Sequence, residues 1–99
     1  MNILRLLYIA TYDICDPKRL RRVFTIMRGY GEHLQFSVFR CELTDRERSE
    51  LMAKLHSEIK HDEDQVLFFP MGPAGGFKES GVFYVGRSYQ PSSHGAIVI

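Results

Sequence analysis

Asp13 and the cations that follow it are the side chains of this sequence best placed to do chemistry together. The stretch YIATYDICDPKRLRRV puts Asp13 directly after an apolar run, as at the end of a strand. Between Pro17 and Tyr30 the chain has five cations and no acid. Like charges at helical spacing repel one another, so the pattern favours a neighbouring anion. The five are Lys18, Arg19, Arg21, Arg22 and Arg28.

A carboxylate at a strand end is suited to a divalent cation if the chain forms a two-fold dimer. Near the dimer axis Asp13 would face its own copy, and Mg²⁺ commonly takes only one or two protein carboxylates beside water and phosphate oxygens. The neighbouring cations would then bind the phosphates of a nucleic acid. This interpretation makes the stretch a phosphodiester site. The alternative, in which Asp13 is a capping or turn residue, stays open on these residues alone.

Length and composition describe one small domain. The chain has 99 residues, a net charge of +1, 44% apolar and 25% charged residues. We expect a single domain over residues 1–99, with a core over about 1–71 and docking segments over about 72–99. No apolar segment approaches the roughly 20 residues of a membrane span, so we expect a cytoplasmic protein. The spacing of Cys15 and Cys41 signals no metal site or disulfide, and both are expected to be reduced thiols.

The N-terminal third predicts a strand followed by an amphipathic helix. Residues 3–12 are apolar at both odd and even positions, which is typical of a strand buried on both faces. Asp16 and Pro17 form an N-cap and a first helical position. The helix is expected to end at Gly29 or Gly31. Its apolar stripe is Leu20, Val23, Phe24 and Met27.

The remaining elements follow in a regular order. Residues 34–43, LQFSVFRCEL, are expected to be extended, with a bend near Ser37 that would split them. The run TDRE, residues 44–47, is a capping box that starts a second helix. VLFFPM, residues 66–71, is the last core strand, and GPAGG after it is a loop. The stripe of the second helix is Leu51, Met52, Leu55 and Ile59.

This order of elements predicts a ferredoxin-like α+β sandwich. Two helices would cover one face of an antiparallel sheet in a βαββαβ order. Two of the strands are apolar at both odd and even positions, so the sheet face away from the helices also needs a cover. A second copy of the same sheet is the expected cover. Short strands over GVFYVG, residues 81–86, and AIVI, residues 96–99, are expected to pair across that homodimer.

Four segments of the sequence are typical of one known family when they occur together. They are a hydrophobic first strand ending in Tyr12 and Asp13, a basic first helix, the run GYGEHLQFSVFRCEL, and the later EDQVLFFPM. In these segments the chain resembles the small CRISPR-associated Cas2 family, the partner of the CRISPR spacer integrase. The resemblance covers residues 3–71, and QFSVF is its most specific part. It implies a ferredoxin-like homodimer with a role in antiviral defence. Together with integrase dimers, this homodimer would take part in the acquisition of new spacers. It also implies binding of DNA or single-stranded RNA.

The resemblance also assigns roles to individual residues. Asp13 matches the family's catalytic aspartate and Mg²⁺ ligand, one from each protomer. Tyr12 is its usual neighbour, and Phe39 matches an aromatic position near the site. The cations of the first helix, Arg19, Arg21 and Arg22, match the family's basic residues in residue type. Their individual positions vary within the family, so no single role is assigned to each. The match departs at His33, where many members have Arg, and an imidazole binds phosphate more weakly than a guanidinium.

Three functions are consistent with these residues. The first is a purely structural scaffold that binds nucleic acid and bridges integrase dimers. The second is a Mg²⁺-dependent endonuclease of RNA or DNA, endoribonuclease-like, in which hydrolysis requires Asp13. The third is a ferredoxin-like regulatory module that binds a small ligand. The acids at 62–64 beside His61 are interpreted as solvated charges of a turn, because consecutive acids point in different directions.

Overall fold

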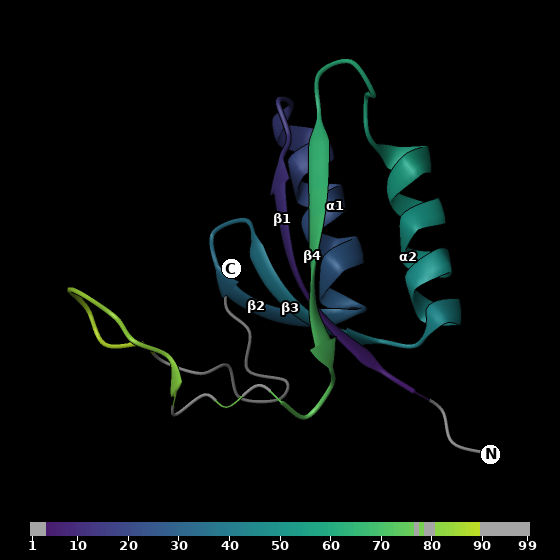
Figure 1. Cartoon of the computed structure of the whole chain (residues 1–99). Helices are drawn as coiled ribbons and strands as arrows, with labels where there is room; N and C mark the ends of the chain where they lie inside the picture. Colours follow the sequence, from purple (N-terminus) through teal and green to yellow (C-terminus); the bar gives the residue numbers. More distant parts are fainter. Residues whose placement is uncertain (1–3, 77, 79–80, 90–99) are drawn as a thin grey trace.

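The chain folds into two layers, a four-stranded sheet and a pair of helices (Figure 1). The computed structural model describes residues 4–76, 78 and 81–89. Within them, no helix is long and apolar enough to cross a lipid bilayer. The elements are β1 (Leu6–Asp13), α1 (Pro17–Arg28), β2 (Gly31–Gln35), β3 (Val38–Leu43), α2 (Asp45–Glu58) and β4 (Gln65–Pro73).

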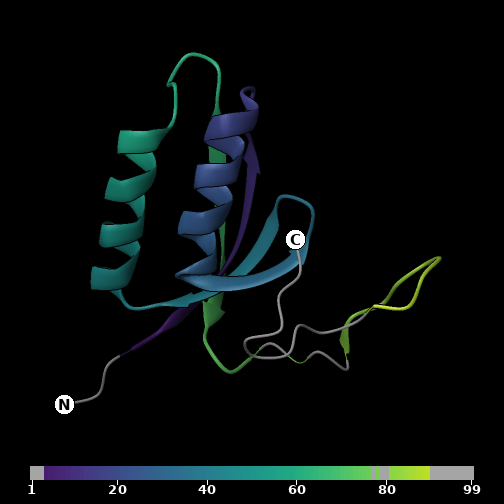
Figure 2. The same cartoon turned by 180° about the vertical axis from the view of Figure 1, so that it is seen from behind.

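The sheet confirms the predicted ferredoxin-like fold. Its strand order is β2-β3-β1-β4, and every neighbouring pair is antiparallel. Both helices lie on the same side of the sheet, behind it in Figure 1 and in front of it in Figure 2. β4 is an edge strand and pairs with the central strand β1, so the end of β1 lies beside the start of β4.

The core lies between the helices and one face of the sheet. On β1 the side chains of Tyr8, Ala10 and Tyr12 point into it, as expected from the alternation of side chains along a strand. Cys41 on β3 is completely buried, and burial raises the pKa of its thiol to about 12. The predicted helix stripes contribute Val23, Phe24, Met27, Leu51 and Leu55, whereas Leu20 and Met52 are exposed.

Local capping signals set the helix boundaries. The Asp16 carboxylate accepts hydrogen bonds from the backbone N–H groups of Lys18 and Arg19, at 3.0 and 2.9 Å, at the start of α1. That helix ends at Gly29. At the start of α2 the predicted capping box is formed with Glu47, which accepts from the Thr44 backbone N–H at 2.9 Å and donates its own N–H to the Thr44 hydroxyl at 3.1 Å.

The predicted extended segment is split into the β2–β3 hairpin. Its turn consists of two residues, Phe36 and Ser37, so the predicted bend near Ser37 is confirmed. The hairpin begins earlier than predicted, at Gly31. A Cβ atom there would lie 2.6 Å from the Arg40 carbonyl oxygen and from the Cys41 sulfur, so only glycine allows this close approach of β2 to β3.

The sheet face opposite the helices is apolar and open in the single chain. Leu67, Phe69 and Met71 of β4 have relative exposures of 41, 47 and 57%. Ile9 of β1 pairs with Phe69 and is half-buried. β1 is therefore buried on its helix side. On the other side Leu7 is buried and Ile9 is half-buried, so the predicted burial on both sides is met in part in the single chain.

Three predictions for the C-terminal part need correction or lie beyond the described residues. β4 continues to Pro73, past the predicted end at Met71, because the Ala74 backbone N–H donates to the Arg5 carbonyl oxygen at 2.9 Å and keeps the two strands together. The predicted strand at 81–86 is wrong for the single chain, where these residues pair with none of the described strands and Val85 is fully exposed. The predicted strand at 96–99 lies outside the described residues.

Candidate functional site

Asp13 is the last residue of β1, where it pairs with Gln65 at the start of β4. Its side chain is exposed and makes no hydrogen bond or ion pair with any described residue. Asp16, three residues later, is the N-cap of α1. The alternative in which Asp13 serves as the cap therefore fails, and its carboxylate is available to a ligand from outside the chain.

A cleft of about 670 Å³ opens beside Asp13. It lies between the end of β1, the first turns of α1 and the β2–β3 turn. Arg21 and His33 bring basic groups to it, and Asp13 is the one acid among its described lining residues. The others are Tyr12, Ile14, Pro17, Leu20, Phe24, Phe36 and Ser37. The structure thus brings Asp13, Tyr12 and Arg21 of the predicted site together in one cleft.

The five predicted cations of α1 differ in their partners. Lys18 is exposed and Arg21 lines the cleft, and neither forms an ion pair with a described residue. Arg22 pairs with Glu58 of α2 at 3.1 Å. The guanidinium of Arg28 lies 5.9 Å from the centre of the Phe24 ring. Arg19 is held in ion pairs described below, so Lys18 and Arg21 are the cations best placed to bind phosphate.

Asp64 is a buried carboxylate that sequence reasoning missed. Its side chain is fully buried and accepts from the Arg19 guanidinium at 2.8 Å, the Cys15 backbone N–H at 2.9 Å and the Lys60 backbone N–H at 2.8 Å. These bonds, chiefly that from Arg19, hold the pKa of the Asp64 carboxyl far below its usual range. The interpretation of Asp64 as solvated turn charge is wrong, because long-range partners enclose it. Asp62 and Glu63 are exposed, as predicted.

The Asp64 bonds fix the chain directly after the candidate site. Asp64 binds the backbone of Cys15, two residues beyond Asp13, and it immediately precedes Gln65, the strand partner of Asp13. Arg19 adds a second bond to the same turn through Glu63 at 3.2 Å. The loop between β1 and α1 is therefore tied to the start of β4, and this tie sets the position of the Asp13 backbone.

Aromatic rings pack beneath the cleft. Phe39 is completely buried, with its ring centre 5.5 Å from that of Phe24 and 6.2 Å from that of Tyr12. Burial raises the pKa of the Tyr12 hydroxyl. His33, at the position where the resemblance departs, lies 5.1 Å from Phe39, and its Nε2 is 2.6 Å from the Phe36 carbonyl oxygen. The His33 ring is therefore packed into the hairpin, and Phe39 supports the site from below.

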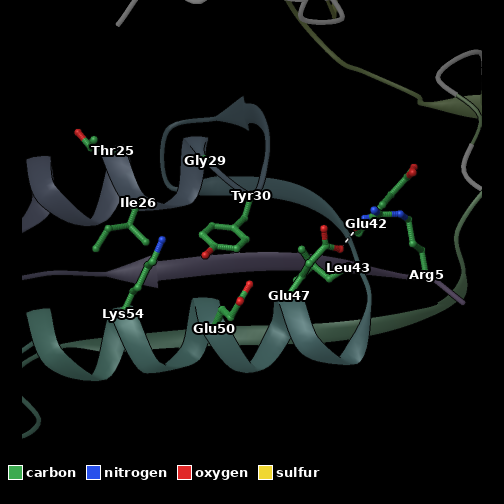
Figure 3. Close-up of a pocket in the computed structure, with 10 residues that line it drawn as sticks. All are labelled: Arg5, Thr25, Ile26, Gly29, Tyr30, Glu42, Leu43, Glu47, Glu50 and Lys54. Carbon is green, nitrogen blue, oxygen red and sulfur yellow. Dashed lines mark hydrogen bonds and ion pairs between the residues drawn. The ribbon is translucent and has the colours of Figure 1, made fainter. Parts of the chain in front are cut away.

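A second cleft, of about 450 Å³, lies on the helix side of the molecule (Figure 3). Its floor holds Tyr30, whose ring centre is 4.9 Å from the Lys54 ammonium, and Arg5 pairs with Glu47 at its edge. The Tyr30 hydroxyl raises the pKa of Lys54. None of the predicted site residues lines this cleft.

Comparison with known protein families identifies the family of this chain. The family described as CRISPR associated protein Cas2 matches residues 6–77, which include every element of the sheet and both helices. The chain belongs to the Cas2 family. The match begins at the first residue of β1 and thus includes Asp13 and the α1 cations. The resemblance based on Tyr12, Asp13 and QFSVF is confirmed.

Relatives and solved structures agree with this assignment. A protein from Rhodospirillum rubrum named CRISPR-associated endoribonuclease Cas2 1 is 38% identical over 93% of this chain and 89% of its own length. A Geobacter sulfurreducens protein named CRISPR-associated endoribonuclease Cas2 is 37% identical over 94% and 97%. The crystal structure of Streptococcus pyogenes Cas2 has a TM-score of 0.63 and 32% identity, covering 67% of this chain and 86% of that one.

Proposed function

We propose that this Cas2-family chain is a metal-dependent endonuclease of RNA or DNA that also binds nucleic acid during CRISPR spacer acquisition. The observation that carries the proposal is the Asp13 carboxylate, which is exposed, free of partners among the described residues, and placed in a cleft with Arg21. The endoribonuclease names of relatives with 37 and 38% identity support the same activity.

The functional unit in this proposal is a two-fold homodimer. The open face of β1 and β4 exposes Leu67, Phe69 and Met71 in one row, and such a face needs an apolar cover. A second copy of the sheet offers a self-complementary surface. In that arrangement each copy contributes one Asp13, which gives the pair of carboxylates that a shared cation needs.

The residues present fit a Mg²⁺ ion shared in this way. No three His, Cys, Asp or Glu side chains gather as a metal site within the described part of the chain. Mg²⁺ needs only one or two carboxylates, and water and phosphate oxygens fill its other positions. When bound, Mg²⁺ supplies charge for the phosphate oxygens and lowers the pKa of a bound water.

The other side chains of the cleft bind and orient the strand. Arg21, and Lys18 on the exposed side of α1, attract the phosphodiester backbone through charge-assisted hydrogen bonds. Arg19 and Asp64 hold the loop that follows Asp13 in place. Because Asp13 is the one acid among the described residues of the cleft, no second carboxylate there can act as a general base, and we expect slow turnover.

The lack of a second acid among the described residues of the cleft also favours a second candidate, a scaffold without nuclease activity. In both candidates the partners are the integrase dimers of spacer acquisition and the DNA that they carry. The exposed side chains of Phe83, Tyr84 and Val85 support such docking, because they are apolar and lie outside the sheet. Scaffolding depends on the cations and this segment, whereas hydrolysis depends on Asp13.

Cleavage and binding by matched variants separate the two candidates. Single-stranded RNA and duplex DNA are incubated with wild type, Asp13→Asn and the control Asp45→Asn, an exposed aspartate at the start of α2, with Mg²⁺ or with EDTA. We expect Asp13→Asn to remain a folded dimer with unchanged binding and to cut at least about 100-fold more slowly. Equal cleavage by wild type and Asp13→Asn would refute the nuclease site, and binding without cleavage by any of them would establish the scaffold.

A further inference from the structure

Phe36 gives the cleft beside Asp13 an aromatic wall that phosphate binding and hydrolysis do not require. Its side chain is 83% exposed, although it belongs to one of the largest apolar residue types. It lines the same cleft as Asp13 and Arg21. The cleft volume of about 670 Å³ lies within the range of sites that enclose small organic groups.

The backbone holds Phe36 in this exposed position. Its φ is +40°, a conformation that side chains other than glycine rarely adopt, in the two-residue turn of the β2–β3 hairpin. The backbone on each side of the ring is tied down, with the Phe36 carbonyl oxygen 2.6 Å from His33 Nε2 and the Ser37 carbonyl oxygen accepting from the Tyr12 N–H at 3.2 Å. The core position beneath the turn is already filled by Phe39.

The charged groups of the cleft complement a nucleotide. Arg21 provides a fixed positive charge with bidentate hydrogen-bonding geometry, which suits phosphate. Phe36 provides an aromatic face, and Leu20, which is 40% exposed, provides a further apolar contact on α1. A nucleotide in a strand has the same three properties, a charged phosphate, a flat aromatic base and an apolar sugar edge.

We propose that this cleft binds one unpaired nucleobase stacked on Phe36, with the adjoining phosphate on Arg21. Stacking on an aromatic side chain requires a free face of the base, which single strands offer and a continuous duplex does not. The protein therefore prefers single-stranded nucleic acid, with little dependence on base identity. This inference rests on the proposed function only for the class of ligand, because stacking needs neither the metal ion nor hydrolysis.

A double-mutant cycle between protein and ligand tests the stacking contact directly. Affinities are measured in EDTA, so that nothing is cut, for an oligothymidylate of about 12 nucleotides and for an abasic strand of the same length. The proteins are wild type, Phe36→Leu, which keeps an apolar side chain without a ring, and Phe36→Tyr, which keeps the ring. Met52→Leu on α2, at 40% exposure, is the control for an exposed apolar site away from the cleft.

We expect wild type to bind the oligothymidylate about 5- to 100-fold more tightly than the abasic strand. That ratio should fall toward one in Phe36→Leu and be preserved in Phe36→Tyr and Met52→Leu. Affinity for a duplex of the same length should be the same in all four. Phe36→Leu is expected to fold, because the Phe36 side chain is exposed and leucine has to adopt the same positive φ that phenylalanine already adopts at this position. Circular dichroism checks the fold of the variant.

Two results would overturn the base site. One is an unchanged ratio in Phe36→Leu, and the other is a Phe36→Leu protein that is monomeric where wild type is dimeric, which would make Phe36 a contact between copies. The cleavage assay of the proposed function is independent of both. If wild type does not cut while the ratio depends on Phe36, hydrolysis fails and the base site stands. If wild type cuts while the affinity ratio is unchanged in Phe36→Leu, the base site fails and hydrolysis stands.

Discussion

At the scale of single residues, Asp13 and Asp64 show how one residue type serves two purposes in this chain. Asp13 is exposed and has no partner among the described residues, which leaves its charge for an external cation. Asp64 is buried, and its carboxylate accepts hydrogen bonds from Arg19 and from two backbone N–H groups. The buried acid fixes the chain around the exposed one, so the stability of the fold and the proposed function depend on different carboxylates.

The Asp64 carboxylate is expected to stabilise the fold in a pH-dependent way. Asp64→Asn should lower the Tm by about 10 °C at pH 7, because it leaves the Arg19 charge without its main partner. The folded-state pKa of Asp64 is depressed, so its contribution is fully present above the ordinary aspartate pKa of about 4 and is lost as pH falls further. The difference in Tm should therefore be constant from about pH 7 to 5 and shrink below about pH 4.

The exposed neighbour Asp62 provides the control for this prediction. Asp62→Asn changes the same charge in the same turn, and thermal unfolding followed by circular dichroism should show a Tm within about 2 °C of wild type. A loss of stability in Asp64→Asn that is equally large at pH 3 and pH 7 would mean that packing, and not charge, accounts for the role of Asp64.

The sequence singled out Asp13 as a candidate site residue but did not predict the buried bonds of Asp64, and the reason is physical. An acid that ends an apolar run beside a basic helix is a local pattern, readable from a few consecutive residues. The bond between Arg19 and Asp64 joins residues 45 positions apart, and it exists only because β1 and β4 are neighbours in the sheet. In the sequence Asp64 is one of three consecutive acids, with nothing to distinguish it from Asp62 and Glu63.

At the scale of elements, boundaries set by local chemistry were predictable and those set by pairing were not. Asp16 and the Thr44 capping box fixed both helix starts, because each cap involves residues within three or four positions. The strand predicted at 81–86 has the right side chains, yet a strand also needs a partner for its backbone groups, and none of the described strands pairs with it. β4 extends past Met71 for the converse reason, since Arg5 pairs with Ala74.

Loss of the second helix cap should have a measurable cost. Thr44→Ala removes the hydroxyl that accepts from the Glu47 backbone N–H at 3.1 Å, and we expect a loss of about 1 kcal/mol in the free energy of unfolding. For a domain of this size that corresponds to a Tm lower by about 4–8 °C. Thermal unfolding is the measurement.

Thr25→Ala on α1 is the matched control for the cap. The Thr25 hydroxyl donates to the Arg21 carbonyl oxygen at 3.0 Å within the helix, an exposed bond that contributes little. Its Tm should stay within about 2 °C of wild type. Equal shifts for the two variants would show that the Thr44 cap does not hold the start of α2.

At the scale of the whole molecule, the sheet has one face covered by helices and one face open. The open face carries Leu67, Phe69 and Met71 in a row along the edge strand β4, which pairs with the central strand β1 (Figure 1). Because Asp13 ends β1 beside the same strand, a second copy on this face would bring two cleft edges toward each other. Dimerisation and metal binding are thus linked in the proposed function.

A charge on the open face should separate the copies. Phe69→Lys places an ammonium group in the middle of the apolar row, so the mass measured by light scattering should fall from about twice 11.5 kDa to 11.5 kDa. Met52→Lys on α2, with 40% exposure on the helix side, should leave the mass at the dimer value. A dimeric Phe69→Lys protein would place the interface elsewhere.

The most direct test of the account is the stoichiometry of divalent metal binding. Titration with Mn²⁺, followed by its electron paramagnetic resonance signal, should show one ion bound per pair of wild-type chains, because each copy contributes a single Asp13 carboxylate. Asp13→Asn should lose this ion while remaining dimeric, Phe69→Lys should lose it by becoming monomeric, and Asp45→Asn should keep it. An ion retained by Asp13→Asn with wild-type affinity would contradict the central claim that paired Asp13 carboxylates form the metal site.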